Sequence, residues 1–213
     1  MIWTAATPIY LPLMFPDSVL AAAHRLADDV ERVLGARPPL RHQPAPFGRP
    51  QILIAPDPAY TAVVAPAEPQ TFAVLTVRDE LTVSGAEPFG TVLSLAWLAQ
   101  AVLGLDPLGD WQGRQPAPRE RIEVELSHEQ PRWPTRRRAW ALAADELAGW
   151  PERRVWVLAE ALLRCGGNRL ETAGGEDPRV AEVCDVLGLE TGRADEMTVS
   201  AESLDRGDVP RWW

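Results

Sequence analysis

The chain has 213 residues, a formal net charge of −9, two cysteines and three histidines. This length suffices for one large domain or two small ones with proper cores. The negative charge argues against a nucleic-acid-binding protein, which needs a basic surface to neutralise phosphates. No segment is long and apolar enough to span a membrane, and no basic region precedes an apolar run at the N-terminus. We therefore expect a cytoplasmic protein with no membrane partner and no nucleic-acid partner.

The first half of the chain alternates strand and helix patterns. The apolar run at residues 8–15 is typical of a strand. A helix follows from Asp17, with apolar residues three and four positions apart, and Gly35 is placed to end it in the left-handed conformation. Residues 51–56, 71–77 and 80–85 predict three strands. The last two of these flank Arg78-Asp79, which predicts a tight hairpin.

A second helix is predicted over residues 88–103, followed by a strand over residues 121–126 with clean alternation of apolar and polar residues. The helix is apolar on all sides, so more than one of its faces must be covered. Two helices and about five strands predict a two-layer α/β sandwich that occupies residues 1–130.

The second half, residues 131–213, repeats a strand–helix pattern. Strands are predicted at residues 136–143 and 168–174, with a helix over residues 151–167 between them. A further helix has Asp177 as its N-cap, Pro178 at its first position and Gly188 as its stop. A last strand falls near residues 189–192 or 197–200. This order predicts a βαβαβ segment with a parallel sheet.

Three stretches of the first half carry a family resemblance: LADDVERVLGARPP, QILIAP and ELTVSGAEPFGTVLSLAWLAQAVLGLDPLGDWQGRQPAPRERIEV. Together they resemble the N-terminal domain of bacterial xylan α-glucuronidases and, more loosely, the accessory domain that precedes the barrel in β-hexosaminidases. In those families a helix runs into a Gly-hydrophobic-x-Pro turn, then a Trp, then a basic strand. The matching residues here are Gly104, Leu105, Asp106, Pro107, Trp111, Arg119 and Arg121.

The second half is similar to the first strands of the family's catalytic barrel. RRRAWALAADE resembles the first strand, ALLRCGGNRLETAG the first helix and second strand, and VAEVCDVLGLETGRADEMTVSAES the next helix and third strand. The resemblance implies an accessory domain followed by a truncated (β/α) barrel segment. A closed barrel of this type takes about 250 residues, so we expect this segment not to close.

The resemblance implies a glycoside-hydrolase-like, α-glucuronidase-related, carbohydrate-active protein that is not catalytic as an isolated chain. The family has two histidines after the third barrel strand, and this chain has none there. The residues in that place are Arg193, Ala194, Asp195, Glu196 and Met197. The alternative is a non-catalytic scaffold or protein-interaction module that keeps the fold.

Four carboxylates are the candidate catalytic residues. Asp145 and Glu146 follow the first strand of the second half, where barrel enzymes place their functional groups. Asp195 and Glu196 could face them across a cleft, as glycoside hydrolysis by two carboxylates requires. Both pairs have a structural alternative. The first suits the N-terminal turn of a helix, and the second suits a solvated loop.

Aromatic residues supply the candidate binding surface. Trp133, Trp140 and Trp150 could stack against sugar rings, whereas we expect Trp111 to be buried. Cys165 and Cys184 are predicted to be core residues, because their spacing fits no zinc motif. The histidines are scattered along the sequence. We therefore expect no metal and no other cofactor.

The partner expected for the second half is another protein chain. An unclosed parallel segment leaves strand edges with unpaired N–H and C=O groups. We expect a homodimer, or a separate partner chain, to cover this open edge. Trp212 and Trp213 add apolar surface at the end of the chain. A carbohydrate ligand is the other partner that the resemblance implies.

Overall fold

The computed structural model describes residues 1–12, 14–43, 49–55, 68–130, 132–133, 135–173, 177–194, 200–207 and 209–211. The chain divides into two compact units. The first unit comprises Met1–Gly104 and Pro116–Pro134, and the second comprises Leu105–Gln115 and Thr135–Trp213. The predicted mixed α/β class is confirmed, and the described residues form no closed barrel. No helix in these ranges combines the length and the apolar character needed to cross a membrane.

The first unit contains a six-stranded mixed sheet with the strand order β3-β2-β4-β6-β5-β8. The first four strands in this order are parallel, and β5 runs antiparallel to both of its neighbours. Two further short strands, β1 and β7, pair antiparallel beside it. The bounds are β1 (Ile2–Trp3), β2 (Ile9–Tyr10), β3 (Leu40–Arg41), β4 (Gln51–Ala55), β5 (Phe72–Val77), β6 (Glu80–Gly85), β7 (Ile122–Glu123) and β8 (Ser127–Glu129).

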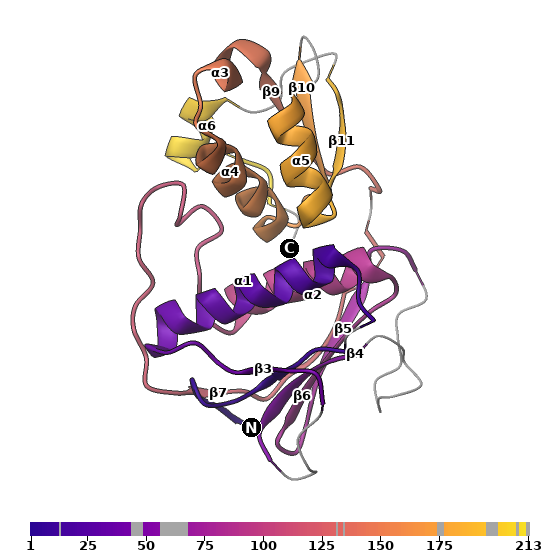
Figure 1. Ribbon diagram of the computed structural model, residues 1–213, viewed down its shortest axis with the longest axis vertical. Coiled ribbons are helices and arrows are strands. Elements are labelled where there is room, and N and C mark those ends of the chain that lie inside the picture. Colours follow the sequence, from indigo (N-terminus) through magenta and orange to yellow (C-terminus); the bar gives the residue numbers. More distant parts are fainter. Residues whose placement is uncertain are drawn as a thin grey trace. The chain divides into compact units, whose positions relative to one another are not determined.

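Two helices of the first unit, α1 (Asp17–Leu34) and α2 (Pro88–Ala101), lie side by side over the sheet (Figure 1). α1 ends at Gly35, whose φ of 81° gives the left-handed cap that the sequence predicts. In α2 six consecutive residues, from Gly90 to Leu95, are buried. This burial explains why the sequence of α2 is apolar on all sides, because a helix completes more than a full turn over six residues.

Two strands of the first unit differ from their predicted extents. The strand predicted at residues 8–15 is only two residues long, because Pro12 has no N–H to donate to a neighbouring strand. Of the strand predicted at residues 121–126, only Ile122–Glu123 forms a strand, β7, and the next strand, β8, begins at Ser127. The N–H of Val124 donates to Met1 O on the β1 side, whereas the N–H of Leu126 donates to Oγ1 of Thr76 on β5. The segment therefore changes partners halfway, which alternation alone could not reveal.

The second unit has a three-stranded parallel sheet with the order β11-β10-β9. Both connections step in the same direction, so right-handed crossovers place α4 and α5 on the same face, as Figure 1 shows. Asp177 caps α5 through the N–H of Arg179, and Gly188 ends it with a φ of 72°, as predicted. The bounds are β9 (Ala139–Ala143), α3 (Ala144–Ala148), α4 (Glu152–Arg164), β10 (Arg169–Ala173), α5 (Pro178–Leu187), β11 (Glu190–Arg193) and α6 (Ala201–Arg206).

A buried polar network joins the amino ends of β9 and β10. Arg138 is 1% exposed, and its Nε and Nη1 donate to the main-chain oxygens of Gly166 (2.6 Å) and Thr135 (3.1 Å). Asn168 accepts a hydrogen bond from the N–H of Arg138 (2.8 Å) and donates one to Arg136 O (2.5 Å). Burial lowers the pKa of Arg138 to about 10, so the side chain stays charged at neutral pH. This end of the sheet is thus built for stability.

Candidate functional site

The carboxyl ends of β9, β10 and β11 form the edge of the sheet that carries function in barrel enzymes. β9 leads directly into α3, and both Asp145 and Glu146 lie in the first turn of that helix. Asp145 is exposed, and its Oδ1 accepts a hydrogen bond from the N–H of Glu146 (3.1 Å). Asp195 and Glu196 lie outside the described residues. The structure therefore places one candidate pair at this edge, and the pairing with the second stays a prediction.

A side-chain clamp occupies the same edge, and sequence reasoning missed it. Nη1 of Arg179 donates to Trp150 O (2.5 Å), and Nη2 donates to Leu147 O (2.9 Å). The same guanidinium pairs with Asp177 Oδ2 at 2.5 Å. The hydrogen bond from Arg179 is the main cause that lowers the pKa of Asp177 below its ordinary value. The clamp ties α3 and the segment after it to the start of α5. The carboxylate of Asp177 is therefore held in a structural contact.

One face of the parallel sheet carries a row of charged side chains. Glu171 on β10 is only 2% exposed, and its two oxygens meet Arg137 Nη2 at 2.5 Å and Arg169 Nε at 2.6 Å. Arg169 also reaches Glu190 on β11, with Nη1 3.2 Å from Oε2. Gly192 makes room for this arrangement, because a Cβ there would overlap the guanidinium of Arg169. The buried carboxylate is thus flanked by two arginines.

Strand register assigns this charged row to a single face. Side chains on a strand alternate between faces, and the register aligns Glu171 with Ala141 and Gly192 on the neighbouring strands. Trp140 and Leu170, which are aligned with each other, belong to the other face and are fully buried. The apolar face matches the side covered by α4 and α5, and the opposite face carries alanine, glycine and the charged row.

The three tryptophans predicted to bind sugar rings are all buried. Trp133, Trp140 and Trp150 are 6%, 0% and 8% exposed. Trp133 belongs to the first unit, where its Nε1 donates to Gln70 O (2.8 Å). Trp140 and Trp150 belong to the second unit, so the three tryptophans do not all lie in one unit. Their role in binding stays a prediction.

Trp111 is half-buried, which corrects the expectation that it is fully buried. Its Nε1 donates to Asp205 Oδ1 (2.8 Å), and its ring is tilted against Trp150 with the centroids 5.3 Å apart. The guanidinium of Arg154 lies 4.6 Å from the ring centroid of Trp111 and 4.5 Å from that of Trp150. This packing fastens the segment before Gln115 to α6 and α4 within the second unit.

The cysteines are buried and unpaired with each other. Burial raises the pKa of both Cys165 and Cys184 to about 12, so neither thiol forms a thiolate nucleophile at neutral pH. Among the residues that the structure describes, no group of three or more histidine, cysteine, aspartate or glutamate side chains could hold a metal ion.

Comparison with known proteins gives matches to solved structures. No family model matches the sequence, and no curated protein matches it. A GH115 4-O-methyl-α-glucuronidase with specificity for decorated arabinogalactans aligns over 91% of this chain, with a TM-score of 0.75 and 15% identity. The GH20 chitobiase of Flavobacterium johnsoniae aligns over 98%, with a TM-score of 0.59 and 12% identity. A β-hexosaminidase of Streptomyces plicatus aligns over 89%, with a TM-score of 0.59 and 14% identity.

The matches cover only part of the solved structures, because the aligned region takes up 29%, 34% and 41% of those three chains. At these identities the likeness concerns the fold. The predicted resemblance is therefore confirmed at that level: the chain has a glycoside-hydrolase-like fold.

Proposed function

We propose that this chain is an α-glucuronidase-related, carbohydrate-directed protein that binds its ligand without hydrolysing a glycosidic bond by itself. In this proposal the first unit corresponds to the accessory domain of those enzymes, and the second to the opening strands of their barrel. The carbohydrate part of the proposal rests on the fold likeness to GH115 and GH20 enzymes. One fold can carry many functions. The side chains of the second unit therefore decide whether the protein hydrolyses glycosidic bonds.

The observation that carries the non-hydrolytic part is the charged row on the sheet. In a (β/α)₈ barrel the face away from the helices is the barrel interior, which is filled mainly by bulky branched side chains. In this chain that face carries Arg137, Arg169 and buried Glu171 between alanines. Ion pairs on this face suit a sheet that is not packed as the centre of a closed barrel.

The carboxylates at the functional edge support the same conclusion. Glycosidases need two carboxylic acids about 5 to 9.5 Å apart on opposite sides of the scissile bond. Asp145 and Glu146 are adjacent on one short helix, and Asp145 accepts a hydrogen bond from the next N–H. The nearby carboxylate of Asp177 is held by Arg179. Asp145 thus serves a helix start and Asp177 a loop contact, and adjacent Asp145 and Glu146 do not suit the two sides of a scissile bond.

The binding part of the proposal is tested by titrating the protein with oligosaccharides and following heat or amide chemical shifts. Glucuronic-acid-substituted xylo-oligosaccharides, unsubstituted xylo-oligosaccharides and N-acetylglucosamine oligomers form the ligand set. We expect saturable binding of at least the substituted set, with the ligand recovered intact. Failure of every ligand to shift any resonance at millimolar concentration would contradict the carbohydrate assignment.

A protein-interaction module is the second candidate, and the edge strand β11 favours it. Among the residues that the structure describes, β11 pairs only with β10. An edge strand of this kind can accept a further strand on its other side. A homodimer, or a partner chain, could add a strand there. Multi-angle light scattering across micromolar concentrations distinguishes the cases. A dimer that is lost when Thr191, at the centre of β11, is replaced by proline would favour the module, and a monomer throughout would exclude the homodimer.

A further inference from the structure

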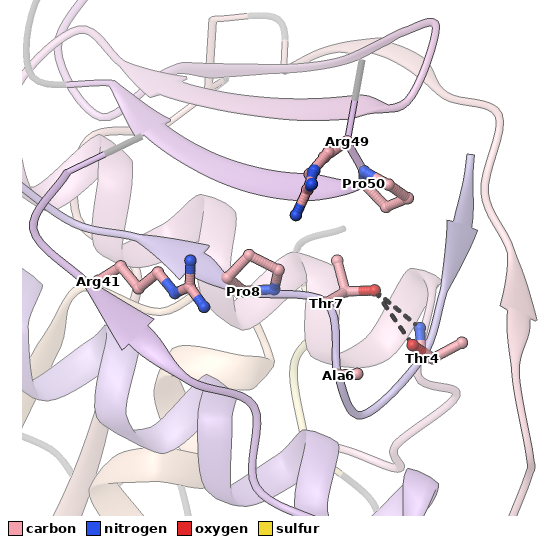
Figure 2. A pocket seen from close by; sticks show the side chains of 7 residues that line it. All are labelled: Thr4, Ala6, Thr7, Pro8, Arg41, Arg49 and Pro50. Atoms are coloured by element: carbon pink, nitrogen blue, oxygen red, sulfur yellow. Dashed lines mark hydrogen bonds between the residues drawn. The ribbon is translucent and has the colours of Figure 1, made fainter. Parts of the chain in front are cut away.

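A cavity of about 320 Å³ opens on the first unit. Its walls come from the turn between β1 and β2, from the end of β3 and from the residues just before β4 (Figure 2). The described residues that line it are Thr4, Ala6, Thr7, Pro8, Arg41, Arg49 and Pro50. A volume of this size lies at the lower end of the range for small-molecule sites, which fits a single ring better than a chain of rings.

The charge in this cavity is positive, although the whole chain carries −9. Figure 2 shows the side chains of Arg41 and Arg49 extending toward Pro8 from two separate segments. Both are exposed, and neither forms an ion pair with any residue in the part of the chain that the structure describes. Two guanidinium groups that share a cavity repel each other, and a bound anion would remove that repulsion.

The remaining lining combines two threonines with an alanine and two prolines. Oγ1 of Thr7 accepts a hydrogen bond from the N–H of Thr4 (3.0 Å) and lies 3.4 Å from the hydroxyl oxygen of Thr4. Figure 2 shows the two hydroxyl groups directed toward each other within this turn, beside the cavity. Pro8 and Pro50 supply ring carbons. A ligand with an anionic group, several hydroxyl groups and an apolar ring face would match these surfaces.

The choice between a carboxylate and a phosphate follows from the main chain. Phosphate sites usually use several main-chain N–H groups, often at the start of a helix. Here the lining comes from strand ends and turns, Pro8 and Pro50 have no N–H, and that of Thr4 is already bonded to Thr7. Arginine forks bind carboxylate and phosphate alike, so the scarcity of main-chain N–H donors is the feature that favours a carboxylate here. We propose that this cavity binds a carboxylate-bearing monosaccharide, a sugar acid. The proposal relies on the carbohydrate-directed function only for its choice of a sugar.

The test is a titration of the whole chain with sodium glucuronate, glucose and inorganic phosphate, each monitored by amide chemical shifts and calorimetry. Glucuronate should bind with shifts at Thr4 and Thr7, and glucose at least about tenfold more weakly, since it lacks the charge-assisted hydrogen bonds. The double substitution Arg41→Gln with Arg49→Gln should weaken glucuronate binding by at least about tenfold. Arg121→Gln, an exposed arginine of the same unit, removes one charge as a control and should leave binding unchanged.

Three outcomes would overturn the site. Phosphate that binds through Arg41 and Arg49 as tightly as glucuronate would show that the cavity selects oxyanions rather than sugar acids. Glucuronate binding that survives the double substitution would place the ligand elsewhere, and no binding of glucuronate would remove the site altogether. Because both arginines are exposed, thermal melts of the variants should match the wild type. If neutral oligosaccharides still bind the variant that lacks both Arg41 and Arg49, the proposed carbohydrate-directed function is supported independently of this cavity.

Discussion

Asn168 accepts a hydrogen bond from the N–H of Arg138 over 2.8 Å, and so joins the amino ends of two parallel strands 30 residues apart in sequence. The charged side chain of Arg138 is buried and satisfied by the main-chain oxygens of Gly166 and Thr135. Removing a buried donor leaves such oxygens without a partner, at a cost of about 1 to 3 kcal/mol each.

Arg138→Met should therefore lower the free energy of unfolding by about 3 kcal/mol. The methionine keeps the N–H that Asn168 binds but loses the donors to Gly166 and Thr135. Chemical denaturation measures the change, with Arg153→Met on the exposed side of α4 as the matched control, which should stay within about 0.5 kcal/mol of wild type. Equal stability of the two variants would show that the network is not stabilising.

Gly90→Ala should destabilise the first unit. A Cβ at Gly90, in the first turns of α2, would overlap the carbonyl oxygen of Thr71, which belongs to rigid backbone. We expect a net loss of about 2 kcal/mol in denaturant melts, after the better helix propensity of alanine is counted. The control is Gly149→Ala, because a Cβ there meets no atom within 4 Å and φ is −90°. A loss at Gly149 as large as at Gly90 would show that steric overlap is not the cause.

The stability of the second unit should fall in acid through Asp177. Its pKa is lowered in the folded protein, chiefly by the hydrogen bond from Arg179. Between the ordinary pKa of 3.8 and the lower pKa in the folded protein, the unfolded chain binds more protons than the folded one. The stabilising contribution of Asp177 is therefore present above pH 3.8 and is lost as the pH falls toward the pKa of the folded state. Between about pH 5 and about pH 3, the melting temperature should fall less steeply with pH in Asp177→Asn than in wild type.

Arg179→Met provides the matched comparison, because it removes the cause of the low pKa and keeps the carboxylate. This variant should melt at a lower temperature than wild type at pH 7, because it loses the hydrogen bonds to Leu147 and Trp150. Its melting temperature should also depend less steeply on pH in acid. An acid slope as steep as that of wild type in both variants would assign the acid sensitivity to other groups.

Trp111→Ala should cost about 2 kcal/mol, less than a fully buried tryptophan, since the ring is half-buried. Trp111→Phe keeps a ring against Trp150 and Arg154 but loses the hydrogen bond to Asp205, so it should cost about 1 kcal/mol. Differential scanning calorimetry separates the two contributions. Equal losses in both variants would mean that the hydrogen bond, rather than ring packing, holds this segment.

Local signals predicted the four longer helices well, but not the short helices α3 and α6. Gly35 ends α1, and Asp177, Pro178 and Gly188 bound α5, because caps act through residues that are neighbours in sequence. The split between β7 and β8 was not predictable in this way. It depends on Met1 and on Thr76, which are distant in sequence from this segment.

At the carboxyl ends of β9, β10 and β11, local features were likewise predictable and long-range contacts were not. The sequence placed Asp145 and Glu146 after a strand, and the structure puts them in the helix turn that was the structural alternative. The reach of Arg179 to two main-chain oxygens has no sequence signal. The charged row does have one: Arg169 and Glu171 are two residues apart on a strand, which places both on one face. Their partner Arg137 lies 34 residues before Glu171 and could be found only from strand pairing.

The purified wild-type chain is expected not to hydrolyse glycosidic bonds, and an activity assay measures this. The protein is incubated with aryl glucuronides, glucuronic-acid-substituted xylo-oligosaccharides and aryl N-acetylglucosaminides, and released products are measured over several hours beside Asp145→Asn and Glu146→Gln. We expect no product above the buffer blank for any of the three proteins. Turnover by the wild type that disappears in Asp145→Asn would contradict it and would make the functional edge of the second unit an active site.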